Sequence, residues 1–257
     1  CDLLEHPLAA QTRNPPAGLR GTRQRTKMDI RRYTGVRFVR RAPTRDGQYI
    51  ELRVANLEPS HVLWWHSHVQ PIIDEDPNRV DNDWNWMLFA PMTRLFGLAT
   101  AKRPVGYTVG IAARETDQFI PCALVLLLGR DRALDDHARR STFTWYLSTA
   151  PDAALLNIDD YALEQGQLPK RLGSIALDVG VTHSLNHVAR GRLSLHSDPA
   201  GGDRLLGWYR KRGMTILPEG KRLPLGPRRL VKPSDGHYCY YTIADAVAAS
   251  RSLDELR

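Results

Sequence analysis

A segment in the second half of the chain has the residue types and spacing of an anion site at the start of a helix. Residues 169–191 read PKRLGSIALDVGVTHSLNHVARG, with the small residues Gly173 and Ser174 ahead of apolar positions at helical spacing. Unpaired N–H groups and the positive dipole end favour phosphate at a helix N-terminus. Lys170 and Arg171 add positive charge there. The pattern predicts a phosphate-binding turn.

The next segment predicts a strand, a turn and a helix that carries a tyrosine. Residues 192–196 (RLSLH) favour a strand, residues 197–202 (SDPAGG) a turn, and residues 203–212 a helix that Gly213 ends. Tyr209 lies on this helix. An aromatic residue on an amphipathic helix is typical of a core position.

The remaining elements must position these two segments. Residues 48–57 alternate apolar and polar side chains, and three β-rich runs follow a stretch with helical periodicity. Strands that follow one another in this way indicate an α+β fold with a mainly antiparallel sheet. The expected strands are residues 48–57, 106–113, 118–129, 141–150, 192–196, 214–217 and 237–243, the last two as a hairpin, and the expected helices are residues 60–70, 87–96, 173–191, 203–212 and 244–256.

An acidic and aromatic stretch lies ahead of the second expected helix. Residues 74–86 (DEDPNRVDNDWNW) hold five carboxylates and two tryptophans. They form either one wall of a pocket for a cationic or amine ligand, or an acidic helix start with tryptophans in the core. Candidate proton acceptors are Glu75 and Asp83 in this stretch and Asp159 and Asp160 in residues 152–165.

Most of the net charge of +8 belongs to the N-terminal segment. Residues 1–46 hold eleven Lys and Arg against four Asp and Glu, so the rest of the chain is nearly neutral. Its prolines and glycines leave too little apolar surface to fold alone. We expect a basic, flexible arm or a leader, for which Met28 is a candidate start; a lipidated Cys1 is an alternative. Residues 47–257 then form a single domain.

The cysteines and the hydropathy exclude several classes of protein. Cys1, Cys122 and Cys239 are far apart and show no zinc-ligand spacing, which argues against a disulfide framework and favours a reducing, cytoplasmic setting. The apolar run 122–128 is far shorter than the roughly 18 residues of a membrane span. His66 and His68 point to different sides of a helix, so no metal site is expected.

The two C-terminal segments together resemble the GNAT superfamily of acyl-coenzyme A-dependent N-acyltransferases. LPKRLGSIALD (168–178) is similar to the family's pyrophosphate loop, and RLSLHSDPAGGDRLLGWYRKRGM (192–214) to its fifth strand and fourth helix. The pairing of Tyr209 with Gly213 just before a strand is the most specific part. Leu168 and Arg171 differ from the family, which has Gln or Arg and then Gly at these positions. The resemblance covers residues 144–217 closely and 48–243 loosely.

The resemblance implies a fold and a site. The fold is a mixed, mostly antiparallel central sheet flanked by helices, whose fourth and fifth strands splay apart to admit the pantetheine arm. Tyr209 would return a proton to the leaving thiolate. The implied cofactor-binding residues are Leu147, Ser148, Thr149, Lys170, Arg171, Leu172, Gly173, Ser174 and Asp198.

The function that the resemblance implies is transfer of an acetyl group from acetyl-coenzyme A to a primary amine of a small molecule or a protein. No metal and no membrane take part, nucleic acid is disfavoured as a partner, and a homodimer is left open. Two alternatives remain at this point. One is a catalytically silent acyl-coenzyme A-binding protein of the same fold; the other is a nucleic-acid-associated protein that uses the basic arm.

Overall fold

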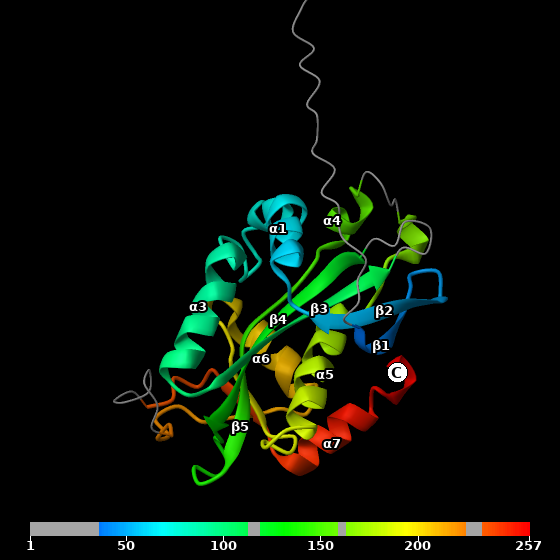
Figure 1. Ribbon diagram of the computed structural model, residues 1–257. Coiled ribbons are helices and arrows are strands. Elements are labelled where there is room, and N and C mark those ends of the chain that lie inside the picture. The colour runs from blue at the N-terminus through cyan, green and yellow to red at the C-terminus, as the bar shows by residue number, and fades with distance from the viewer. Residues whose placement is uncertain (1–35, 113–118, 159–162, 225–232) are drawn as a thin grey trace, which may run out of the picture.

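One eight-stranded sheet runs through the part of the chain that the computed structural model describes, residues 36–112, 119–158, 163–224 and 233–257 (Figure 1). Its strand order is β1-β2-β3-β4-β5-β6-β8-β7, and among these strands β5 and β6 are the one parallel pair. The strands are β1 (Val36–Pro43), β2 (Tyr49–Asn56), β3 (Arg103–Ala112), β4 (Phe119–Arg132), β5 (Arg140–Thr149), β6 (Leu193–His196), β7 (Thr215–Ile216) and β8 (Tyr238–Tyr241).

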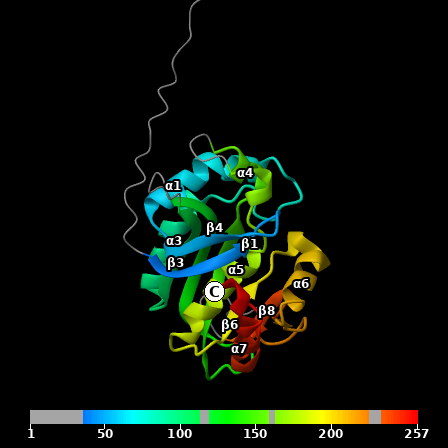
Figure 2. The ribbon, with the colours of Figure 1, turned by 90° about the vertical axis from the view of Figure 1, so that its right-hand side faces the viewer.

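Helices cover the sheet and gather at its two ends. Figure 2 shows β6, β8, α6 and α7 together at one end of the molecule and α1 and α4 at the other. In the described residues no helix has the length and apolar character that crossing a membrane requires. The helices are α1 (Pro59–His68), α2 (Gln70–Asp74), α3 (Trp86–Ala99), α4 (Asp152–Leu156), α5 (Leu172–Leu185), α6 (Gly202–Arg210) and α7 (Ile243–Arg251), with short 3-10 turns η1 (Gln165–Gln167), η2 (Pro199–Gly201) and η3 (Asp254–Leu256).

Two apolar clusters hold the layers together. The larger one joins α1, α2 and α5 to β4, whose residues from Phe119 to Leu128 are all buried. This explains why residues 118–129 lack the polar alternation of a strand with one exposed face. The second cluster lies between α5, α6, α7 and one face of β6 and β8, and includes Leu193, Leu195, Tyr209 and Cys239. The helix with the phosphate-binding turn and the helix with Tyr209 therefore share a core.

The predicted fold class is confirmed, and so are the predicted strands and helices in the residues that the structure describes. The helices expected over residues 173–191 and 244–256 end earlier, at Leu185 and Arg251. The terminal hairpin is present as the antiparallel pair β7–β8.

One boundary was wrong: Val36–Pro43, assigned to the arm, form the edge strand β1. The positive charge of this stretch concealed the strand. Ala42 is buried, and so is Arg40, whose Nε donates to Asp178 Oδ2 of α5 at 3.0 Å. Arg40, paired with Asp178, thus points into the protein at a position where the sequence pattern predicts an exposed polar residue. Residues 1–35 of the proposed arm lie outside the described residues.

Candidate functional site

The sheet opens between its two parallel strands. Cα partners join β5 and β6 at three positions, the last of which is Thr144 with Leu195. Beyond it β5 continues to Thr149, whereas β6 ends at His196. The edge of β5 from Trp145 onward therefore has no strand partner on the β6 side. The splaying of these strands, expected from the resemblance, is confirmed.

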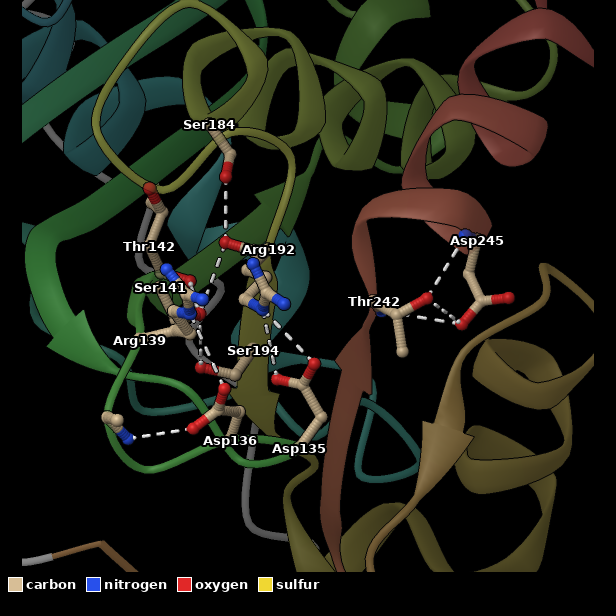
Figure 3. A network of polar contacts seen from close by, with 11 residues as sticks. Asp135, Asp136, Arg139, Ser141, Thr142, Ser184, Arg192, Ser194, Thr242 and Asp245 are labelled. Atoms are coloured by element: carbon tan, nitrogen blue, oxygen red, sulfur yellow. Dashed lines mark hydrogen bonds and ion pairs between the residues drawn. The ribbon is translucent and has the colours of Figure 1, made fainter.

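A polar cluster fixes the closed end of this opening (Figure 3). The backbone oxygen of Arg192 accepts hydrogen bonds from the Thr142 amide at 2.9 Å, from Ser141 Oγ at 3.1 Å and from Ser184 Oγ at 2.7 Å. The Arg192 side chain in turn pairs with Asp135 at 3.1 Å. Three donors on one carbonyl anchor β5, α5 and β6 to one another, so the strands diverge away from this point.

A cavity of about 1460 Å³ follows β5 from Phe143 to Ala150 and passes through the opening. It is large enough for a long, flexible ligand. The cofactor-binding residues expected from the resemblance lie on its wall, and so does Tyr209. These residues are Leu147, Ser148, Thr149, Lys170, Arg171, Leu172, Gly173, Ser174, Asp198 and Tyr209.

The N-terminus of α5 forms one end of the cavity. No side chain caps it, so in the described residues its first N–H groups are left for a ligand or solvent. Arg171 occupies the N-cap position with φ of 63°, the left-handed region that favours glycine. The backbone thus has the conformation that glycine would adopt at this position. The Arg171 side chain turns away to an ion pair with Glu255.

Helix α6 lies against this turn through Trp208 and Arg212. A Cβ on Gly173 would be 3.0 Å from the Trp208 ring, so any larger residue would require Trp208 to shift. The Arg212 guanidinium lies 3.4 Å from the Trp208 ring centroid, and its Nε donates to Ser174 Oγ at 3.0 Å. Sequence reasoning missed both residues. Trp208 and Arg212 are four residues apart in the helix expected over residues 203–212. This spacing places two side chains on the same side of a helix, and it was the available signal.

Tyr209 lies beside Trp208 on the cavity wall and is 9% exposed. Burial raises the pKa of its phenol well above the usual value, so the hydroxyl stays protonated at neutral pH. Among the described residues none hydrogen-bonds this hydroxyl. The hydroxyl can therefore donate a hydrogen bond to solvent or to a ligand in the cavity.

The acidic and aromatic stretch contributes Asp81 and Trp84 to the cavity. Asp81 is buried and accepts two hydrogen bonds from Arg79, at 2.8 and 2.6 Å, and one from Ser148 Oγ. Arg79 also donates to the Thr149 carbonyl at 2.7 Å, which ties the stretch to the end of β5. The interpretation as a pocket wall holds for these residues, whereas Trp86 lies in the core.

The candidate proton acceptors named from the sequence do not gather at the cavity. Glu75 and Asp83 are exposed and lie outside its wall. Asp159 and Asp160 fall outside the described residues. No cluster of three His, Cys, Asp or Glu side chains in the described ranges could hold a metal ion.

The aromatic lining is continuous along the other half of the cavity. β5 has a bulge at Trp145, where Leu126 pairs with Tyr146 and Leu127 with Thr144. Tyr146 contacts Trp84 edge-to-face at 5.1 Å. Nearby, Thr144 Oγ1 is buried without a hydrogen-bond partner in the described residues.

Comparisons with known proteins give matches of structure alone. No family model matches the chain, and neither does any curated protein sequence. A solved structure of a mutant AtaT toxin bound to the C-terminus of its antitoxin AtaR and acetyl-CoA matches 77% of this chain and 96% of its own, at 12% identity and a TM-score of 0.43. Spermidine N-acetyltransferase from Vibrio cholerae with CoA and spermine matches 76% of this chain and 98% of its own, at 13% identity and a TM-score of 0.43. A chimera of SpeG from Vibrio cholerae and hSSAT has 12% identity over 76% of this chain and 98% of its own, with a TM-score of 0.45.

Proposed function

We propose that this protein is an acetyltransferase of the GNAT type that moves an acetyl group from acetyl-coenzyme A to a primary amine. The observation that carries the proposal is the course of one cavity, which joins an uncapped helix N-terminus, a strand edge without a partner and a buried tyrosine. A diphosphate, a pantetheine chain and a thioester need these three features in this order.

The phosphate end is supplied by the first turn of α5 and by the cations around it. The backbone N–H groups of Leu172, Gly173 and Ser174 would donate to phosphate oxygens. Lys170 and Arg212 would add charge-assisted contacts. These residues border the cavity together, and Gly173 keeps the backbone accessible beneath Trp208.

The exposed edge of β5 would orient the rest of the cofactor. Leu147, Ser148 and Thr149 pair with β4 on one side and have no strand partner on the β6 side, and the Thr149 carbonyl is held in place by Arg79. Peptide-like amides can pair with such an edge as a further strand would. Bound acetyl-coenzyme A supplies an activated acetyl group with a thiolate leaving group.

Tyr209 would protonate that leaving thiolate. Burial raises its pKa, so the hydroxyl carries its proton at neutral pH and is available to donate it to the departing sulfur. The buried wall around it also limits the access of water, which would otherwise hydrolyse the thioester.

The proposal is tested by measuring ligand binding and turnover separately. Acetyl-coenzyme A at 100 times its dissociation constant should stabilise the chain by about 2.7 kcal/mol in a thermal-shift experiment. Thiol release in the presence of a panel of primary amines then distinguishes an enzyme from a silent acyl-coenzyme A binder. Lack of any stabilisation by acetyl-coenzyme A would exclude both.

A further inference from the structure

A histidine on the cavity wall is paired with an aspartate, and the sequence analysis identified neither residue. His196 is the last residue of β6 and lies on the cavity wall. Its Nε2 is 2.8 Å from Asp235 Oδ2. The other Asp235 oxygen accepts the His237 amide at 3.0 Å, so the carboxylate is held in place by the backbone.

The protonation of this pair follows from its geometry. Partial burial of Asp235 raises the pKa of its carboxyl, but the hydrogen bonds from His196 and His237 outweigh this and hold the pKa below its usual value. The carboxylate is then an acceptor, so Nε2 of the neutral His196 carries the hydrogen and donates it. Nδ1 is left as a base, and among the described residues it has no hydrogen-bond partner. This is how a carboxylate orients an imidazole that takes up protons.

His196 and Tyr209 border the cavity from opposite faces of the sheet. Leu195 packs with Tyr209 in the cluster beneath α5 and α6, and neighbouring strand residues point to opposite faces. His196 pairs across the ladder with Tyr238, whose ring lies 4.5 Å away, and Tyr238 packs in the separate cluster on the other face. A thioester placed in the opening would have Tyr209 on one side and His196 on the other.

The carboxylates of the cavity wall are already engaged. Asp81 is held by Arg79 and Ser148, Asp131 by Lys102, and Asp152 by Arg45. Asp198 accepts the Ala200 amide at 2.9 Å as a helix cap. Each of these carboxylates therefore already has a hydrogen-bond or ion-pair partner. His196 combines a position on the wall with a basic nitrogen that no described residue occupies.

We propose that His196 is the proton acceptor for the amine in this reaction and that Asp235 is its positioning residue; the inference rests on the proposed function. The amine nitrogen forms a bond to the thioester carbonyl carbon, the bond from that carbon to sulfur breaks, and sulfur keeps the electron pair. His196 Nδ1 takes the proton that the nitrogen loses, and Tyr209 gives its own proton to the thiolate. Solvent then returns His196 and Tyr209 to their starting states.

This arrangement also indicates which side the acceptor enters. The amine must approach from the face of His196 and Tyr238, opposite to α5 and α6. The titratable and charged groups that face His196 are Asp235, His237 and Tyr238 from the segment leading into β8 and Asp198 two residues further along its own segment. The aromatic wall at Trp84 and Trp145 favours an amine attached to an apolar or aromatic group.

The test compares His196→Gln and Asp235→Asn with His66→Gln, a control at an exposed position of α1. Thiol release from acetyl-coenzyme A is measured with 2-phenylethylamine from pH 6 to 9, and coenzyme A binding by calorimetry. We expect His196→Gln to lower kcat about 100-fold, with coenzyme A affinity within about twofold of the unaltered chain. Asp235→Asn should lower kcat about tenfold and change the pH profile. The control should change neither.

A rescue experiment distinguishes proton transfer from a structural effect. Imidazole added to His196→Ala should restore part of the rate, and it should not restore Tyr209→Phe. Unchanged kcat and pH profile in His196→Gln would overturn the proposal while leaving the acetyltransferase assignment intact. Coenzyme A binding without turnover of 2-phenylethylamine by the unaltered chain would also overturn it. If the unaltered chain does not bind coenzyme A, the proposed function is rejected instead.

Discussion

The Nε of Arg212 donates a 3.0 Å hydrogen bond to the hydroxyl of Ser174, and this bond joins the end of α6 to the first turn of α5. The same guanidinium stacks on Trp208 and donates to its carbonyl at 3.0 Å. The helix that presents Tyr209 is therefore fixed to the helix whose N-terminus faces the cavity. The turn proposed to bind phosphate and the residue proposed to donate a proton are thus held in one arrangement by this contact.

Replacing Arg212 should weaken cofactor binding more than it weakens the fold. Arg212→Gln removes a cation beside the α5 N-terminus and should raise the dissociation constant of acetyl-coenzyme A about tenfold, the range of one charge-assisted hydrogen bond. Calorimetry at two salt concentrations measures this. Lys211→Gln, the neighbouring residue outside the cavity wall, is the control. Equal affinities of the two variants would contradict a role for Arg212 in phosphate binding.

The left-handed backbone at Arg171 should make glycine preferable to alanine at this position. Arg171→Gly and Arg171→Ala both lose the ion pair with Glu255, so they differ only in backbone terms. With φ of 63°, the glycine variant should be more stable by about 1 kcal/mol in chemical denaturation. The opposite order, which holds inside a regular helix, would show that this turn is not left-handed in solution.

The parts of the site that sequence analysis found are those encoded by neighbouring residues. The turn at Gly173 and the helix of Tyr209 follow from local periodicity, capping and small residues, so the cavity wall there was predicted residue by residue. Ser148 was named through the family resemblance, which rests on the same neighbouring segments. These features need no knowledge of how distant segments meet.

The residues that were missed act through contacts between segments far apart in the sequence. Arg212 reaches Ser174 across 38 positions, and Ser148 reaches Asp81 across 67. Asp235 meets His196 only because β8 pairs with β6. β1 was missed because Arg40 is neutralised by Asp178, which is 138 positions away. Pattern and propensity describe one segment at a time and carry no information on such pairs.

Buried His61 should make the protein sensitive to acid. Burial lowers the pKa of His61 to about 4, and its Nδ1 accepts hydrogen bonds from Thr108 and from the Glu58 amide. As the pH falls below about 6.5, the ordinary pKa of histidine, His61 becomes protonated in the unfolded chain but stays neutral in the folded chain. The contribution of His61 to the free energy of unfolding is complete above about pH 6.5 and is lost as the pH falls to about 4.

The loss attributable to His61 amounts to about 3 kcal/mol at most. Denaturation curves from pH 7 to 4 should show a steep loss of stability in the unaltered chain and a shallower one in His61→Gln, whose amide can still accept both hydrogen bonds. Because the other titratable groups are the same in both proteins, the difference between the two slopes of stability against pH reports His61 alone. Parallel slopes would show that His61 is protonated in the folded state.

Removing the hydroxyl of Tyr209 should slow the reaction without weakening cofactor binding. The ring is buried and its hydroxyl has no partner among the described residues, so Tyr209→Phe preserves the packing in the cluster with Leu195 and Cys239. Loss of a positioned proton donor should lower kcat about 100-fold. Because burial raises the pKa of Tyr209, the hydroxyl stays protonated throughout pH 6 to 9, and the loss should be constant over that range. Tyr240→Phe, a partly buried tyrosine outside the cavity wall, is the control for steady-state thiol release. A rate for Tyr209→Phe equal to that of the control would assign Tyr209 to packing alone.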